Sequence, residues 1–273
     1  MDDRPIGIFD SGFGGLTVVR ALIDLLPAED LVYLGDTGRY PYGPRPQEEV
    51  RGYARQITRA LVENHDVKMV VVACNTASAA ALEVLRFEFD TPVVGVIEPG
   101  VRAATTATRN GRVGVIGTVG TVASGAYQRA VRDRRAPVQL TCAACPGFVE
   151  FVEKGETDSD QVHVLAERLL EPVRRAGVDT LLLGCTHYPF LARTIASVMG
   201  RDVVLVSSAE ETAFEVKALL DETGLVRRTA AKGAHRFLSS GDPQLFAEIG
   251  RRLLGPEMAV VEPIEWDAPG EEP

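Results

Sequence analysis

Short runs of aliphatic and β-branched residues alternate along this chain with longer stretches in which apolar residues recur every three or four positions. The short runs predict strands, and the longer stretches predict amphipathic helices that cover a sheet. This regular alternation indicates an α/β fold built on parallel sheets. Strands are expected at Ile6–Asp10, Leu31–Gly35, Met69–Cys74, Val93–Ile97, Val113–Gly117, Val138–Cys142, Leu181–Cys185 and Val203–Ser207, and helices at Gly15–Leu26, Pro46–Asn64 and Ser159–Arg175.

The two halves of this pattern repeat each other. The four strands of the first half recur in the second at a nearly constant spacing of about 110 residues, as duplicated units do. IGIFDSGFGG, beginning at Ile6, aligns with VGVIGTVGTV at Val113, and VVACNT aligns with LLGCTH, although generic strand–glycine–helix patterns are an alternative explanation. Each half thus delivers a cysteine, Cys74 or Cys185, from its third strand. We predict two similar parallel-sheet α/β domains related by a pseudo-twofold, with an active site in the cleft between them.

The strand spacing also predicts the domain boundaries. The first domain is expected to comprise residues 1–97 together with about 210–273, and the second residues 98–209. The segment after about residue 210 contains two helix-like stretches, and we expect it to return to the first domain. The acidic stretch after Pro263, ending in APGEEP, is rich in proline and glycine and predicts a frayed tail without chemistry.

Composition and charge narrow the range of partners. With 273 residues, 45% of them hydrophobic, the chain has enough apolar material for a packed core. A formal net charge of −9 lacks the positive field that nonspecific nucleic-acid binding needs. The N-terminus opens on acidic residues, unlike a signal peptide, and the apolar runs fall short of the roughly 20 residues of a membrane-spanning helix. We therefore expect a cytoplasmic protein that contacts neither nucleic acid nor membrane directly, with its four cysteines as thiols.

Polar and reactive residues stand at the predicted carboxyl ends of the strands, where ligands bind in open parallel sheets. A lone cysteine there is more often a small packing residue, and serine, threonine or asparagine is often a helix cap. Two cysteines at equivalent positions of a repeat favour a shared site, because facing halves would bring both thiols to one cleft. The residues concerned are Asp10, Ser11, Cys74, Asn75, Thr76, Thr118, Cys185, Thr186 and His187.

Two facing thiols suit the inversion of a carbon centre. Inversion removes a proton from one face and delivers another to the opposite face, which a single base cannot easily do. A free thiol titrates at about pH 8.5, so modest tuning leaves one cysteine as thiolate while the other stays protonated. His187 can shift the protonation of the nearby Cys185 thiol. Asn75 and Thr76, entering a predicted helix N-terminus, can hold a carboxylate with backbone amides and side-chain donors.

Two further motifs have competing interpretations. The glycine-rich turn from Asp10 to Gly15 suggests a dinucleotide-binding loop, but Thr17 occupies the third glycine position of G-x-G-x-x-G. We interpret it as a tight turn that brings backbone close to a small ligand. Cys142 and Cys145 have the C-x-x-C spacing of a redox pair or half a zinc site, but no second pair completes a ligand set. A structural role is favoured for them, and no metal site is predicted.

Several segments of the chain closely resemble the glutamate racemase family. They are, in order, IGIFDSGFGGLTV, GDTGRYPYGPR, VVACNTASA, PVVGVIEP and LLGCTHYPF, and the resemblance covers nearly the whole chain. It implies two α/β domains with the active site between them, and interconversion of L- and D-glutamate without pyridoxal phosphate, metal or other cofactor. It further implies a homodimer and a supply of D-glutamate for peptidoglycan, hence for cell wall biogenesis and cell shape.

The resemblance also implies the roles of individual residues. Cys74 and Cys185 correspond to the two catalytic thiols, and Asp10, Glu153 and His187 to polar partners that assist them. Gly147 and Glu150 depart from the family pattern, because an aliphatic residue and a proline are usual at these two positions. The residues that correspond to the substrate shell are Asp10, Ser11, Tyr42, Gly43, Asn75, Thr76, Thr186 and His187.

Two other functions stay open at this level. An aspartate or hydantoin racemase of the same two-cysteine class would share the repeat and the thiols, since the sequence does not reveal the pocket volume that selects substrate length. A noncatalytic ligand-binding or regulatory protein is the second alternative, for instance a sensor of periplasmic type or a regulator of a nucleic-acid enzyme. Some members of the family are reported to modulate DNA gyrase. The acidic charge and the lack of a signal segment count against both forms of this alternative.

Overall fold

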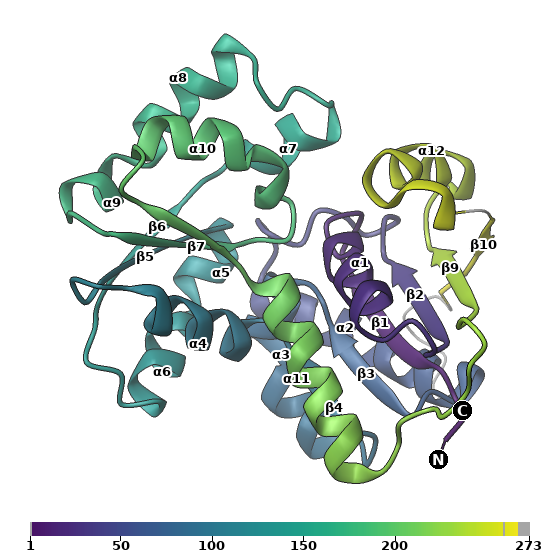
Figure 1. The fold of residues 1–273 in the computed structure, drawn as a ribbon. Coiled ribbons are helices and arrows are strands. Elements are labelled where there is room, and N and C mark those ends of the chain that lie inside the picture. Colours follow the sequence, from purple (N-terminus) through teal and green to yellow (C-terminus); the bar gives the residue numbers. More distant parts are fainter. Residues whose placement is uncertain (1, 259, 267–273) are drawn as a thin grey trace.

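The computed structural model describes residues 2–258 and 260–266, and its strands form two parallel β-sheets with helices on both faces (Figure 1). All pairings between the described strands are parallel. The first sheet contains β1 (Ile6–Asp10), β2 (Leu31–Gly35), β3 (Met69–Val72), β4 (Val93–Gly95), β9 (His235–Ser239) and β10 (Val261–Pro263). The second contains β5 (Arg112–Gly117), β6 (Gln139–Ala144), β7 (Thr180–Gly184) and β8 (Val204–Ser207).

The strand order shows the repeat predicted from the sequence. The first sheet has the order β10-β9-β2-β1-β3-β4, and the second has β6-β5-β7-β8, which matches the stretch β2-β1-β3-β4 strand for strand. The predicted fold class, two similar parallel-sheet α/β units, is confirmed. The bounds of the two strands that precede the cysteines differ from the prediction, however: β3 is shorter, and β7 is shifted by one residue towards the N-terminus. β3 ends at Val72 and β7 at Gly184, so Cys74 and Cys185 lie just beyond the strands instead of on them.

Helices cover both faces of each sheet. On the first sheet α1, α11 and α12 pack on one face, and α2 and α3 on the other. On the second, α4 and α6 pack on one face, and α7 to α10 on the other. None of the described helices is long and apolar enough to cross a membrane. Their bounds are α1 Leu16–Leu25, α2 Gln47–His65, α3 Asn75–Glu88, α4 Ile97–Ala107, α5 Val119–Ala123, α6 Ala126–Asp133, α7 Phe148–Glu153, α8 Asp160–Leu169, α9 Glu171–Arg175, α10 Ala192–Met199, α11 Ser208–Thr223 and α12 Pro243–Leu254, with 3-10 turns η1 Tyr188–Leu191 and η2 Gly255–Glu257.

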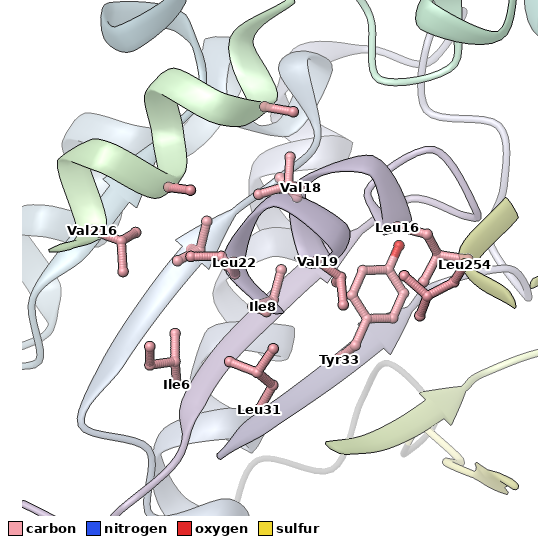
Figure 2. Close-up of a cluster of buried hydrophobic side chains, with 14 of the residues drawn as sticks. Ile6, Ile8, Leu16, Val18, Val19, Leu22, Leu31, Tyr33, Val216 and Leu254 are labelled. Atoms are coloured by element: carbon pink, nitrogen blue, oxygen red, sulfur yellow. The ribbon is translucent and has the colours of Figure 1, made fainter. Parts of the chain in front are cut away.

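The core of the first sheet joins residues from the two ends of the chain. Figure 2 shows the side chains of α1 lying over β1 and β2, with Val216 of α11 and Leu254 of α12 completing the layer. Fully burying one such Val or Leu side chain contributes about 1.5–3 kcal/mol. Since both Val216 and Leu254 are almost completely buried, the C-terminal helices are part of this core.

The C-terminal part of the chain differs from the prediction. The two expected helices are present as α11 and α12, but β9 and β10, which were not predicted, add two strands to the first sheet. β9 pairs with β2 and places His235 opposite Leu31. The segment after α11 therefore packs on the first sheet, while the domain boundaries near residues 97 and 210 stay a prediction.

Two local expectations were wrong. The predicted helix Ser159–Arg175 is divided at Leu170 into α8 and α9, because Pro172 in the first turn of α9 has no N–H for a continuous helix. The predicted frayed tail is ordered from residue 264 to 266: the Ile264 amide donates to the Ser239 carbonyl over 2.9 Å, and Trp266 hydrogen-bonds to a buried side chain. Residues 267–273, the remainder of the predicted tail, lie outside the described residues.

Candidate active site

A pocket of about 120 Å³ lies where the carboxyl ends of the two sheets meet. Sites for drug-sized ligands measure about 300–1,000 Å³, so this volume suits a molecule no larger than an amino acid. Both predicted catalytic thiols line it, one from each half of the chain. The predicted site residues that line the pocket are Ser11, Tyr42, Gly43, Cys74, Asn75, Thr76, Cys185, Thr186 and His187.

Cys74 is the N-cap residue of α3, and its thiol accepts a hydrogen bond from the Ala77 amide over 3.4 Å. The Ser11 hydroxyl lies 3.7 Å from the same sulfur. Burial, and secondarily the charge of Asp10, raises the pKa of the Cys74 thiol to about 12, against the lowering effect of these two contacts. In the empty pocket Cys74 is therefore a thiol at neutral pH, placed where a proton can be delivered.

Cys185 has a different partner. Its sulfur lies 3.8 Å from Nδ1 of His187, and Nε2 of the same ring lies 3.4 Å from Oε1 of Glu153, an ion-pair distance. Burial by itself would lower the pKa of His187, but Cys185, Glu153 and the charge of Asp10 together raise it to about 10. His187 is therefore an imidazolium at neutral pH, and its positive charge stands beside the Cys185 sulfur.

Asp10 and Glu153, two of the predicted catalytic partners, do not line the pocket, but each contacts a residue that does, Thr186 and His187 respectively. Asp10 is completely buried, and burial raises its pKa despite the opposing charge of His187. Its Oδ1 accepts a hydrogen bond from the Gly12 amide over 2.7 Å, and its Oδ2 accepts one from the Thr186 hydroxyl over 3.1 Å. Asp10 thus connects the first sheet to the cysteine-bearing loop of the second.

The glycine-rich turn allows the two halves to approach closely. A Cβ atom at Gly14 would lie 2.3 Å from Oγ1 of Thr186 and 2.5 Å from Nδ1 of His187. Such distances are far below van der Waals contact, so only glycine leaves room for the second loop. The turn serves contact between the halves in addition to the predicted approach of backbone to ligand.

Asn75 and Thr76 stand at the N-terminus of α3, but their side chains are arranged differently from the carboxylate-holding donors that we predicted. The Asn75 amide nitrogen donates to the Tyr127 hydroxyl over 2.8 Å, which leaves its buried Oδ1 without a partner among the described residues. Oγ1 of Thr76 lies 3.0 Å from Oγ1 of Thr118 and 3.1 Å from Oγ1 of Thr121. These contacts again join the first half to the second.

Several residues of the pocket were absent from the predicted site. Most of them come from loops, where no periodic signal exists, although Tyr40 belongs to the GDTGRYPYGPR segment. Val119 begins α5, and Val149 and Glu150 lie on α7. The Tyr40 hydroxyl is buried without a hydrogen-bond partner among the described residues, and its ring centroid lies 6.4 Å from that of His187. The additional lining residues are Tyr40, Pro41, Pro44, Val119, Cys145, Pro146, Gly147, Val149 and Glu150. Thr118, which was expected at the end of a strand, also lines the pocket.

The C-x-x-C pair is divided between two environments. Cys145 lines the pocket and is buried, whereas Cys142 is half-buried and lies outside the pocket lining. Burial raises the pKa of Cys142 to about 11 and that of Cys145 to about 12, which is the opposite of the low pKa of a redox-active pair. In the described part of the chain, no three His, Cys, Asp or Glu side chains group closely enough to hold a metal ion.

Two parallel-sheet α/β units that share one thiol-lined pocket are the fold and the site of an amino-acid racemase. The chain belongs to the family described as Asp/Glu/Hydantoin racemase, which matches residues 6–216. It is 55% identical over 260 residues to the glutamate racemase of Mycobacterium leprae, covering 95% of each chain. Among solved structures, glutamate racemase isoform RacE1 from Bacillus anthracis superposes with a TM-score of 0.92 at 39% identity, covering 99% of this chain and 100% of that one. The Francisella tularensis glutamate racemase in complex with D-glutamate gives a TM-score of 0.90 at 33% identity, covering 97% and 98%.

Proposed function

We propose that the protein interconverts L- and D-glutamate, with Cys74 and Cys185 as the acid–base pair and without a cofactor. The observation that carries the proposal is that a thiol from each half of the repeat lines one pocket of amino-acid size. The Mycobacterium leprae relative and the two structural neighbours described above are glutamate racemases, one of them in complex with D-glutamate, which supports glutamate as the substrate.

The reaction needs two proton transfers. A thiolate on one side of the substrate takes the α-proton and becomes a thiol, and the electron pair stays on Cα and the adjoining carboxylate. The thiol on the other side then donates its proton to Cα and becomes the thiolate. One C–H bond breaks and one forms, so no electrons are gained or lost and the reaction runs in either direction.

The two thiols differ in their surroundings, and this difference supports different roles for them. Burial holds the pKa of Cys74 at about 12, so Cys74 is the resting acid. We assign Cys185 as the base, because the imidazolium of His187 lies 3.8 Å from its sulfur. Glu153 in turn keeps the His187 ring protonated from the far side.

The pocket presents a carboxylate, Glu150, together with His187 and neutral polar groups, which suits a molecule that carries both an ammonium group and carboxylates. Its described lining contains no Lys or Arg, so the two carboxylates of glutamate would be held by hydroxyls and by backbone amides at the N-terminus of α3. The unpartnered Oδ1 of Asn75 is a suitable acceptor for the α-ammonium group. Such neutral donors and a dry pocket are also what stabilises the developing charge on Cα.

The decay of circular dichroism of L-glutamate with purified, dialysed enzyme and no added cofactor tests the substrate assignment. We expect the signal to fall to zero with glutamate and to persist with aspartate. Racemisation of aspartate alone would show an aspartate racemase instead, and an unchanged signal with both amino acids would favour the noncatalytic alternative.

The finer expectations rest on the family resemblance. We infer that the D-glutamate produced serves peptidoglycan synthesis and therefore cell shape, that the enzyme works in the cytoplasm, and that it forms a homodimer. Growth of a D-glutamate-requiring bacterial strain that carries this gene tests the biological role. Sedimentation equilibrium tests the homodimer, and a monomer at all concentrations would refute it.

A further inference from the structure

A buried carboxylate divides its hydrogen bonds between the pocket loop and the C-terminal segment. Asp36 directly follows β2, and its side chain is completely buried. Its Oδ1 accepts from the Ser240 hydroxyl over 2.6 Å and from the Trp266 indole over 2.9 Å. Its Oδ2 accepts from Nε of Arg39 over 2.8 Å and from the Tyr42 hydroxyl. Each oxygen therefore serves one part of the chain.

The carboxylate is held firmly by the first sheet. The backbone amide of Asp36 donates to the Asp10 carbonyl over 2.9 Å, at the end of β1. A buried charge of this kind is tolerated only when its lone pairs are satisfied, and four donors satisfy those of Asp36. If one donor is removed, the carboxylate oxygen that it contacted keeps a single hydrogen-bond partner. The direction of the carboxylate is then no longer fixed, and the remaining donors can shift.

The pocket side of this network carries two substrate-shell residues. Tyr42 and Gly43 line the pocket, and the Gly43 carbonyl accepts a hydrogen bond of 2.9 Å from the Gly120 amide of the second half. Tyr42 is almost fully buried, so its hydroxyl has Asp36 as its anchor. The position of the Asp36–Arg45 loop therefore depends on the direction of this carboxylate.

The other side of the network is closed by the C-terminal segment. The Trp266 ring lies 4.4 Å from the Arg39 guanidinium carbon, and the Tyr53 ring lies 4.2 Å from the same atom. Guanidinium groups are attracted to aromatic faces, so Trp266 holds Arg39 as well as Asp36. The Ile264 amide, bonded to the Ser239 carbonyl, continues the pairing of β10 with β9 by one residue, two positions before Trp266.

We propose that Asp36 and Trp266 are positioning residues for glutamate, through which the C-terminal segment fixes the Tyr42–Gly43 part of the pocket. Neither residue lines the pocket, and both act through Tyr42. The inference rests on the proposed function, since the ligand that the loop contacts is taken to be glutamate. It predicts that a change at residue 266 alters substrate binding more than proton transfer.

The variant Trp266→Phe tests this, because it removes the indole N–H and keeps an aromatic ring over Arg39. Since a hydrogen bond to a charged group is stronger than one between neutral groups, its loss should raise the KM for glutamate at least about threefold, with kcat changed less than about twofold. Arg236→Gln is the matched control: it breaks the 2.7 Å Arg236–Glu262 pair between β9 and β10 and should leave KM unchanged. An unchanged KM in Trp266→Phe, or a loss confined to kcat, would overturn the proposal.

A double-mutant cycle separates positioning from a general loss of stability. Combining Trp266→Phe with Tyr42→Phe should raise KM by less than the product of the two single effects, because both act on one carboxylate. A KM increase in the double variant equal to the product of the two single increases would show that the two residues do not act through Asp36. Thermal unfolding of each variant, measured alongside, identifies any that fail to fold.

A measurement on the unaltered enzyme needs no variant. Trp266 is the single tryptophan of the sequence, so its fluorescence reports on this network alone. Titration with D-glutamate should change the emission saturably, with a midpoint close to the KM. If the unaltered enzyme fails to turn over glutamate, the proposed function is wrong, whereas unchanged emission in an enzyme that racemises glutamate refutes only the coupling.

Discussion

Thr186 donates a hydrogen bond of 3.1 Å to Oδ2 of Asp10, and this contact joins the loop that carries Cys185 to the end of the first strand. Asp10 is fully buried and its pKa is raised by burial, so each donor to its carboxylate matters. The same residue contributes to the electrostatic field at His187. The bond therefore couples the geometry of the first half of the chain to the protonation of His187 in the second.

Replacing Thr186 by valine keeps its shape and removes the donor. Leaving a buried group short of a hydrogen bond costs about 1–3 kcal/mol, so we expect kcat/KM for glutamate to fall about tenfold or more. Thr186→Ser, which restores a hydroxyl, should recover most of the activity. Equal losses in the valine and serine variants would mean that the methyl group, not the hydroxyl, is what matters at this position.

Cys74→Ser and Cys185→Ser should each reduce racemisation by about 10²–10⁴-fold, the usual contribution of general acid–base catalysis. Serine is nearly the same size but far less acidic, so each variant loses proton transfer on one face. Cys142→Ser is the control, because this residue lies outside the pocket lining, and it should keep nearly full activity. In the unaltered enzyme, deuterium from solvent should enter the product formed from either enantiomer. Full activity in either catalytic serine variant would contradict the two-base mechanism.

The pKa of His187 predicts a pH dependence of stability. It rises from an ordinary value of 6.5 to about 10 in the folded protein, so folding favours the protonated ring. The resulting stabilisation is complete below about pH 6.5 and is lost as the pH rises through about 10. The difference in free energy of unfolding between the unaltered protein and His187→Asn, measured with urea, should therefore shrink between these pH values. Glu153→Gln should move this loss of stability to lower pH. If the difference in free energy of unfolding between the unaltered protein and His187→Asn stays constant with pH, the raised pKa of His187 is excluded.

Gly14 and Gly52 form a matched pair for a steric test. A Cβ at Gly14 would overlap Thr186 and His187, whereas a Cβ at Gly52, within α2, meets nothing within 4 Å. Gly14→Ala should push the Cys185 loop away and lower kcat at least about 100-fold, as misplacement by about 1 Å does. Gly52→Ala should keep full activity and stabilise the protein by about 0.5–1 kcal/mol. Normal turnover in Gly14→Ala would show that the two halves do not need this close approach.

The sequence predicted the eight strands of the repeat well because β-branched runs bounded by glycine and polar residues have one obvious interpretation. β9 was missed because it is a short strand whose sequence, HRFLS, is half polar. Its pairing partner, β2, lies some 200 positions away in the chain. Such a strand forms because the first sheet offers it an edge, and this depends on the tertiary structure instead of the local sequence. The division between α8 and α9 has a local cause instead, because a single proline, Pro172, interrupts an otherwise continuous amphipathic pattern.

The candidate site was predictable to the extent that it follows from strand ends. Cys74, Cys185 and their neighbours could be placed together because parallel strands deliver their carboxyl ends to one edge. Tyr40 and Cys145 reach the pocket from loops, and nothing periodic indicates where a loop turns. Trp266 lies three residues after Pro263, in a segment whose composition is typical of a tail, so its hydrogen bond to Asp36 could not be anticipated.

The insertion of the second sheet between β4 and β9 sets the order in which the protein can be completed during translation. All four strands of the second sheet come from one continuous stretch, residues 112–207, whereas the first sheet begins at residue 6 and receives β9 only from residue 235 onward. Until then β2 keeps an open edge, which is a template for pairing with other chains. In a nascent chain that stops before residue 235, all strands of the second sheet are present, whereas β2 in the first sheet still has an unpaired edge. We therefore expect a chain terminated there to aggregate through this edge instead of forming a smaller enzyme.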